Sequence, residues 1–152
     1  LTGIKTYSLL KKILTTHNME LTFIEKVKAV NEALRKGEAT GNFTADHKGY
    51  TGYKPQYIID AINTEFCGDW GMQIIDKHTY KSGRTDKNGK EITEAFVHVR
   101  VTLNDKDVDA VASHPVTDDY GDAMKSAQTD AMKKAFAHFS IGNRAYHGLL
   151  KK

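Results

Sequence analysis

Residues 94–103 read EAFVHVRVTL, a run in which every second residue is Ala, Val or Leu. Because successive side chains of a strand point to opposite faces of a sheet, this spacing predicts a β-strand with one buried face. The buried face is expected to hold Ala95, Val97, Val99, Val101 and Leu103, and the other face Glu94, Phe96, His98, Arg100 and Thr102.

The residues on either side of this run predict two more strands. Upstream, an alternating stretch starts at Trp70, whose ring we expect to pack in the core, and ends before a tight reversal at Asn88-Gly89. Downstream, residues 104–107 form another turn, and residues 108–114 form a strand that Pro115 interrupts. The three strands together form an antiparallel meander.

Helical spacing flanks the meander on both sides. Pro55 suits the first turn of a helix that ends at Gly68, with Cys67 expected to be buried beside Phe66. After the strands, Asp118 or Asp119 can cap a long helix. Its apolar face is expected to hold Met124, Ala127, Ala131, Met132, Ala135 and Phe139. The predicted fold class is α+β, a three-stranded antiparallel meander bracketed by helices.

The first 40 residues predict an additional helical region. A short amphipathic helix is expected up to Asn18, and Thr22 with Glu25 forms a possible capping box for a second helix that Gly37 ends. Residues 37–52 show little periodicity and predict a loop. We expect residues 1–152 to form a single domain, with residues 1–40 as its N-terminal helical region.

Composition restricts the class of protein. The chain has 152 residues, 39% hydrophobic and 27% charged, as in an ordinary globular domain. It shows neither an apolar run of bilayer-spanning length nor a secretory signal, which predicts a cytoplasmic protein without a membrane partner. The formal charge of +3 permits a polyanionic partner without requiring one.

Motifs for catalysis are weak. The stretch 83–90 has the wrong glycine spacing for a phosphate loop, and the seven histidines include no pair at the spacing of a zinc helix. The sequence therefore predicts no enzyme activity, metal or cofactor. A metal-dependent nuclease using Asp118, Asp119 and Asp122 is an alternative, although capping and solvation explain these acids more simply.

The excess of positive charge is small, but several cations lie on one face of a predicted helix. In the last helix Lys125, Thr129 and Lys133 are four residues apart and line up, with Lys134 beside them. Such a row can neutralise successive phosphates without sequence preference. A solvated helix face is the alternative interpretation.

A second basic group surrounds the first hairpin and the outward face of the central strand. It contains Lys77, Lys81, Arg84 and Arg100. This ribbon could contact duplex DNA or an incoming strand, but basic hairpin tips also keep sheet edges soluble.

Aromatic residues cluster beside Lys54. Tyr50, Tyr53 and Tyr57 are close in sequence, and aromatics next to cations can stack unpaired bases. Tyr57 can equally be a core residue.

Three segments in order resemble one family. Residues 57–66 (YIIDAINTEF), followed by Gly68 and Trp70, are similar to a helix and turn of the Rad52 superfamily of single-strand annealing proteins, and residues 98–103 (HVRVTL) resemble its central strand. Residues 122–136 (DAMKSAQTDAMKKAF) closely resemble its signature helix. The resemblance covers about residues 50–146, and the short loops suggest the phage Sak-type or bacterial DdrA-like branch.

The resemblance implies a protein that forms rings or helical filaments and holds single-stranded DNA in a basic groove. It implies annealing of complementary strands without ATP in homologous recombination and DNA repair, near the nucleoid of a bacterial or phage-infected cell. Lys133 and Lys134 match the family's basic pair. Tyr57 stands where eukaryotic members have a DNA-contacting arginine, and Ala137 where a further arginine would lie. Lys54 or a stacked Tyr57 is a candidate substitute.

A double-stranded RNA-binding module would share the same order of elements. Such modules recognise the shape and 2′-hydroxyls of duplex RNA. Competition between single-stranded DNA and duplex RNA separates the two hypotheses.

Overall fold

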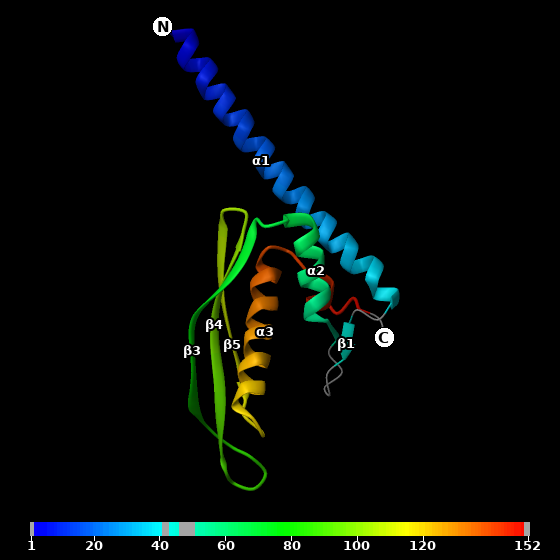
Figure 1. Ribbon diagram of the computed structural model, residues 1–152, viewed down its shortest axis with the longest axis vertical. Coiled ribbons are helices and arrows are strands. Elements are labelled where there is room, and N and C mark those ends of the chain that lie inside the picture. The colour runs from blue at the N-terminus through cyan, green and yellow to red at the C-terminus, as the bar shows by residue number, and fades with distance from the viewer. Residues whose placement is uncertain (1, 41–42, 46–50, 151–152) are drawn as a thin grey trace.

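The structure of the chain is a computed structural model that describes residues 2–40, 43–45 and 51–150. A three-stranded antiparallel sheet in the order β3-β4-β5 lies beside a long helix, α3, and two further helices, α1 and α2, lie toward one end (Figure 1). The predicted α+β class and the meander are confirmed.

The meander contains β3 (Trp70–Thr85), β4 (Glu91–Leu103) and β5 (Lys106–Pro115). At the Asn88-Gly89 reversal, Gly89 adopts a φ of 76°, which an L-residue tolerates poorly, and the backbone N–H of Asp86 donates to the Lys90 carbonyl at 2.8 Å. In the register of the sheet, Val99 lies opposite Ile74 on one side and Ala110 on the other. The apolar face predicted for the central strand is therefore continuous across all three strands.

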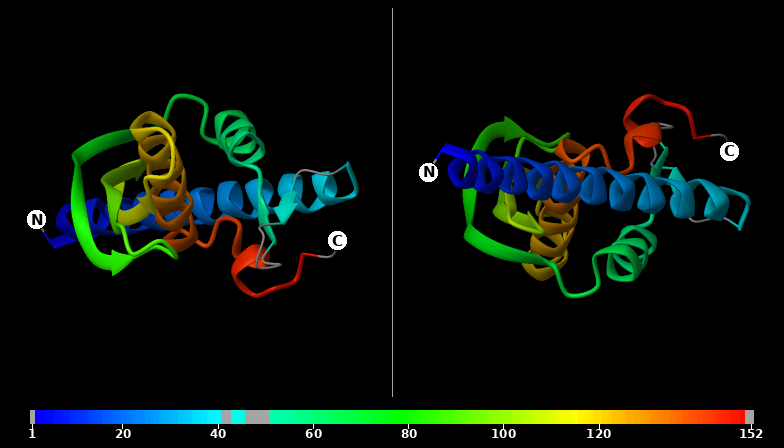
Figure 2. Two further views of the ribbon diagram at one scale, coloured as in Figure 1. Left: turned by 90° about the horizontal axis from the view of Figure 1, so that it is seen from below. Right: turned by 90° about the horizontal axis from the view of Figure 1, so that it is seen from above.

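Helix α3 (Tyr120–His138) covers this apolar face along β4 and β5 (Figure 2). Its first turn is capped by Asp119, whose side chain accepts a hydrogen bond from the Asp122 backbone N–H at 3.1 Å. Small buried residues, Ala127, Ala131 and Ala135, allow the helix to lie close to the strands. In the described part of the chain no helix covers the opposite face of the sheet, and residues 73–81 of β3 are exposed on both faces.

Helix α1 runs without interruption from Thr2 to Gly37, so the prediction of two N-terminal helices is wrong. Residues 4–36 contain neither proline nor glycine and are rich in good helix formers, so nothing ends the first helix. The Thr22 and Glu25 pattern, which resembles a capping box, lies inside a continuous helix. The N-terminal half of α1 projects away from the rest of the molecule (Figure 1).

The C-terminal half of α1 is fixed to the body. Val27, Val30 and Leu34 are buried. Asn31 donates from Nδ2 to the Ser140 carbonyl at 2.7 Å, and its Oδ1 accepts from the Gly142 backbone N–H at 2.9 Å. The base of α1 is therefore held by the segment that follows α3.

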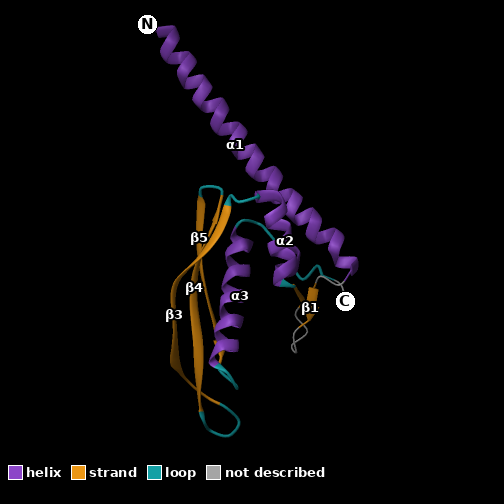
Figure 3. Ribbon diagram, viewed as in Figure 1, coloured by secondary structure: helices purple, strands orange, loops and turns teal. Residues whose placement is uncertain are grey.

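Residues 37–52 are not a plain loop, so this prediction is wrong in part. They include a short 3-10 helix, η1 (Glu38–Thr40), and the strand β1 (Phe43–Ala45), which pairs antiparallel with β2 (Thr51–Tyr53) (Figure 3). Strands of three residues are too short to show a recognisable alternation.

Helix α2 (Pro55–Phe66) begins at the predicted proline. Cys67 is exposed, so the prediction that it is buried beside Phe66 is wrong. The reason is its position at the end of α2, where Cys67 and Gly68 adopt φ values of 22° and 88° and turn the chain outward. Trp70 packs as predicted, with its ring 5.9 Å from that of Phe136 and its Nε1–H donating to Asn63 Oδ1 at 2.7 Å.

A half-buried ionic cluster joins three distant segments. The Glu38 carboxylate accepts hydrogen bonds from the Tyr53 hydroxyl and from Arg144 Nε of helix α4 (Asn143–Tyr146), both at 2.7 Å. The Arg144 hydrogen bond is the main cause that lowers the pKa of Glu38, whereas burial raises the pKa of Tyr53. This cluster fixes β2, and with it the chain that leads into α2.

Candidate nucleic-acid interface

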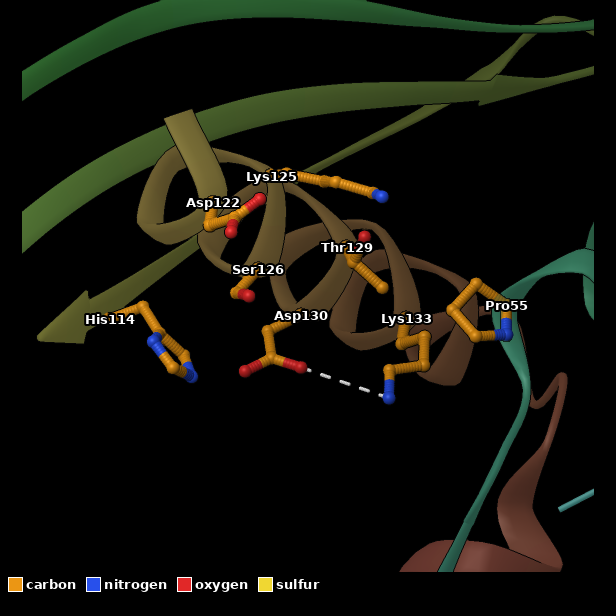
Figure 4. A pocket seen from close by; sticks show the side chains of 8 residues that line it. All are labelled: Pro55, His114, Asp122, Lys125, Ser126, Thr129, Asp130 and Lys133. Atoms are coloured by element: carbon orange, nitrogen blue, oxygen red, sulfur yellow. Dashed lines mark ion pairs between the residues drawn. The ribbon is translucent and has the colours of Figure 1, made fainter. Parts of the chain in front are cut away.

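The polar face of α3 borders a groove of about 480 Å³ (Figure 4). Lys125, Thr129 and Lys133 follow one another along this face, so the structure brings together three residues of the predicted row. His114 of β5 lies at one end of the groove and Pro55 of α2 at the other.

The Pro55 end is formed by the segment that joins β2 to α2. Lys133 Nζ lies 3.8 Å from the position that a β-carbon on Gly52 would occupy. Lys54, a predicted site residue, lies between Gly52 and Pro55 and is exposed. The segment from β2 to α2 therefore lies beside Lys133, although Lys54 is not one of the residues that line the groove.

Two carboxylates also line the groove, of which Asp122 was considered only for the nuclease alternative and Asp130 was not predicted as a site residue. Asp122 and Asp130 line it beside the lysines, and Asp130 Oδ1 lies 3.7 Å from Lys133 Nζ. The groove of one protomer therefore holds two lysines and two aspartates. The three-residue spacing of Asp130 and Lys133 on a helix was the sequence signal for this ion pair.

His114 and Ser126 are the other groove residues that sequence reasoning missed. His114 lies opposite Ala95 in the register, so its side chain is on the face of the sheet that carries α3. The alternation of Ala110, Ala112 and His114 in β5 was the signal that could have placed it there.

Lys134 points away from this groove. Consecutive helical residues differ by about 100° in direction. Lys134 Nζ lies 3.4 Å from the carbonyl oxygen of Val111 on the edge strand β5, where it lines a second hollow of about 470 Å³ with Asp109 and Tyr146. The adjacent lysines of α3 thus border different surfaces.

Comparison with known families gives a clear result. The sequence matches the family model of the Rad52/22 family double-strand break repair protein over residues 50–149, well over half of the chain. The chain belongs to the Rad52 family. This membership places it in DNA repair and recombination. No curated protein matches the chain.

The family match begins just before β2 and ends after α4, so it includes both walls of the groove and the whole sheet. Helix α1 lies outside it. The resemblance inferred from three sequence segments is confirmed at the level of the family, whereas the phage or bacterial branch stays a prediction.

The hairpin cations of this Rad52-family chain are mostly paired with acids. Arg84 forms an ion pair with the buried Glu94, and Lys81 Nζ lies 3.5 Å from Glu91. Lys77 lies opposite Val97, so it projects on the side of the sheet that carries α3. Lys77 and Lys81 are therefore on the same side of the sheet as the groove.

Arg100 lies on the opposite, open face of the sheet. It binds Asp109 through two hydrogen bonds of 2.7 and 3.0 Å, and His98 Nε2 lies 3.0 Å from the same carboxylate. The hydrogen bond from Arg100 is the largest cause that lowers the pKa of Asp109. The positive charge of Arg100 is therefore already paired with Asp109 within the protein.

The two described tyrosines of the predicted cluster do not share one surface, and base stacking by Tyr57 stays a prediction. Tyr53 is buried in the cluster with Glu38, and Tyr57 lines a separate hollow of about 240 Å³ between α1 and α2. Tyr50 lies outside the described residues.

Neither a metal centre nor a membrane span is found in the part of the chain that the structure describes. No group of three or more His, Cys, Asp or Glu side chains there could hold a metal ion. Likewise, none of its helices combines the length and apolarity needed to cross a bilayer. Asp119 has a structural role as the cap of α3.

Proposed function

We propose that this Rad52-family protein binds single-stranded DNA and anneals complementary strands without nucleotide hydrolysis, as an oligomeric ring or helical filament. The observation that carries the proposal is the row of Lys125, Thr129 and Lys133 along one groove within the family-matched region. Binding of double-stranded RNA is the alternative function, and the experiment described below distinguishes it from annealing.

Annealing requires the backbones of two strands to approach while their base edges remain available. Lysine ammonium groups at Lys125 and Lys133 neutralise phosphates, and the Thr129 hydroxyl donates to a phosphate oxygen between them. Such contacts carry no sequence information, so a strand of any sequence is held with its bases outward. The half-buried Lys133, 27% exposed at its side chain, gives the row one cation with restricted freedom.

Oligomerisation compensates for the weak charge of one protomer. A groove with two lysines and two aspartates binds a phosphate backbone weakly by itself. Repeating the groove along a ring raises the effective affinity without new contacts within each site. Both β3 and β5 present unpaired edges in the described sheet, which supports a head-to-tail contact between neighbouring protomers.

The β3 cations support a second DNA site. Lys77 and Lys81 lie on the same side of the sheet as the groove, on a strand that is exposed on both faces. A duplex or an incoming complementary strand would contact these lysines while the first strand occupies the groove.

The experiment compares two double variants. The groove variant carries both Lys125→Ala and Lys133→Ala, and the control carries both Lys28→Ala and Lys36→Ala. Both variants remove two charges, but the control lysines lie exposed on α1. Fluorescence anisotropy with a labelled single-stranded oligonucleotide, at several salt concentrations, reports affinity, and a dye-quenched complementary strand reports annealing.

We expect the groove variant to lose affinity, salt dependence and annealing rate, and the control to retain all three. Equal behaviour of the two variants would overturn the assignment of the groove. Tight binding of duplex RNA without acceleration of strand pairing would overturn the proposed function in favour of an RNA-binding module.

A further inference from the structure

The projecting half of α1 exposes large apolar side chains. Tyr7 is 71% exposed, Leu10 53%, Leu14 60% and Ile24 48%, and Leu9 and Ile13 are similarly open. Contiguous exposed apolar surface of this kind marks a site of association.

The body of the same protomer cannot cover this stripe. The face of α1 that packs on the body holds Val27, Val30 and Leu34. At about 100° per residue, the line through Tyr7, Leu10 and Leu14 lies about a third of a turn or more away from that face. The helix also projects beyond the body along this stretch (Figure 1). The partner must therefore be another molecule.

The spacing of the stripe is that of a coiled-coil seam. Tyr7, Leu10 and Leu14 follow one another by three and four residues, and the same 3-4 spacing continues through His17 and Leu21 to Ile24, with His17 as its one polar position. A 3-4 repeat of apolar residues packs against a second helix with the same repeat. The best match for this surface is a partner with a long amphipathic helix.

We propose that the N-terminal half of α1 pairs with the same segment of a second copy of this chain, in antiparallel orientation. Lys5, Lys11 and Lys12 precede any acidic residue, and Glu20 and Glu25 follow, with Lys26 and Lys28 beside Glu25. An antiparallel pair places Lys11 of each helix near Glu20 of the other, and it also opposes the helix dipoles favourably. A parallel pair would set the three lysines of each helix side by side.

The antiparallel register follows from the seam. Tyr7 of one copy lies opposite Ile24 of the other when the two-fold axis passes between Thr15 and Thr16. The paired stretch is then about 26 Å long at 1.5 Å per residue. Each body is attached at the C-terminal half of α1 (Figure 1), so an antiparallel pair places the two bodies at opposite ends.

This contact differs from the head-to-tail contact of the proposed ring. A two-fold contact uses the same surface on both copies and closes on itself, so it links two assemblies rather than extending one. Helix α1 lies outside the family-matched residues, and the inference does not depend on the DNA-binding groove.

The first test substitutes the seam in the full chain. Leu10→Gln with Leu14→Gln replaces two exposed apolar residues by good helix formers, and Ser8→Gln with Thr15→Gln makes the matched change on the opposite side of α1. Circular dichroism checks that both variants keep their helix content. Sedimentation velocity and light scattering then give the mass of the assembly.

We expect the seam variant to have about half the mass of the unmodified assembly, and the control to keep the full mass. Affinity for single-stranded DNA per protomer should be unchanged in both, whereas the groove variant should keep the full mass. An unchanged mass in the seam variant would overturn the pairing of α1, whatever the outcome for DNA.

The second test determines orientation by disulfide formation in a Cys67→Ser background. Chains with Tyr7→Cys mixed with chains with Ile24→Cys should cross-link to each other under mild oxidation. Leu10→Cys alone should not cross-link to itself, and efficient formation of that homodimer would overturn the antiparallel arrangement. Co-sedimentation with phosphatidylglycerol vesicles gives a further check. If the unmodified chain sediments with the vesicles, and the seam variant does not but keeps the full assembly mass, the stripe binds a lipid surface instead of a second copy.

Discussion

The two sides of the sheet both carry cations and carboxylates, but they differ in how closely the cations are paired. On the side of α3, Lys125 and Lys133 line an open groove in which the Asp130 to Lys133 contact is long, at 3.7 Å. On the open side, Arg100 is held by Asp109 through two short hydrogen bonds, with His98 on the same carboxylate. The difference teaches that pairing, more than the number of cations, decides which surface is able to take a phosphate.

Both sides depend on the packing of α3 against the sheet. Phe136 is fully buried and its ring contacts Trp70, so Phe136→Ala should lower the free energy of unfolding by about 3–5 kcal/mol. Phe96 on the open face is half-buried and lies 4.8 Å from the His78 ring, so Phe96→Ala should cost less. Urea denaturation measures both values, and an equal cost would show that the open face is covered in solution.

The contrast between paired and available cations can be tested directly. Lys133→Ala should reduce the slope of log affinity against log salt by about 0.7 for single-stranded DNA. Arg100→Ala should leave the slope unchanged, because Asp109 already neutralises the guanidinium. Anisotropy titrations at four salt concentrations decide this, and a reduced slope for Arg100→Ala would place the strand on the open face.

Removing the Asp130 carboxylate beside Lys133 should increase the difference between the available Lys133 and the paired Arg100. Asp130→Asn releases the ammonium group and should tighten binding of single-stranded DNA by about two- to fivefold, the range expected for an exposed ion pair. Asp105→Asn is the matched control in an exposed turn. Weaker binding in Asp130→Asn would mean that the carboxylate positions Lys133 rather than competing for it.

The smallest effect concerns acid pH on the open face. Because the pKa of Asp109 is lowered in the folded chain, its pairing contributes stability above the ordinary carboxyl pKa of about 4, and this contribution disappears as the pH falls through the folded value. Thermal melts of the unmodified chain and Asp109→Asn should differ at pH 7, and the difference should shrink as the pH falls below the ordinary carboxyl value. A difference that stays constant over the whole acid range in which the chain is folded would contradict this linkage.

The sheet and α3 were predictable because their signals are local and long. The alternation through residues 94–103 and the apolar repeat of α3 each extend over several periods, so burial follows from spacing. Lys125, Thr129 and Lys133 lie together for the same reason. Helix geometry also separates Lys134 from Lys133, although the sequence places them side by side.

The remaining features depend on contacts between distant segments. Burial of Tyr53 requires Glu38 and Arg144, and no local pattern reports such a cluster. The exposure of Cys67 follows from backbone angles at a helix end. The continuity of α1 was misread because a capping pattern outweighed the absence of any residue that ends a helix.

The hydrogen bonds of Glu38 with Tyr53 and Arg144 affect the order in which the chain folds during synthesis. Glu38 and Arg144 are 106 residues apart, and Asn31 is joined to Ser140 and Gly142 across 109 and 111 residues. A growing chain that has completed the sheet still lacks the groups that fix β2 and the start of α2. Contacts of such large sequence separation form late, so the Pro55 wall of the groove closes only after residues 140–144 have been made. A nascent chain that has not yet reached residue 140 therefore lacks the contacts that hold the Pro55 wall of the groove in place.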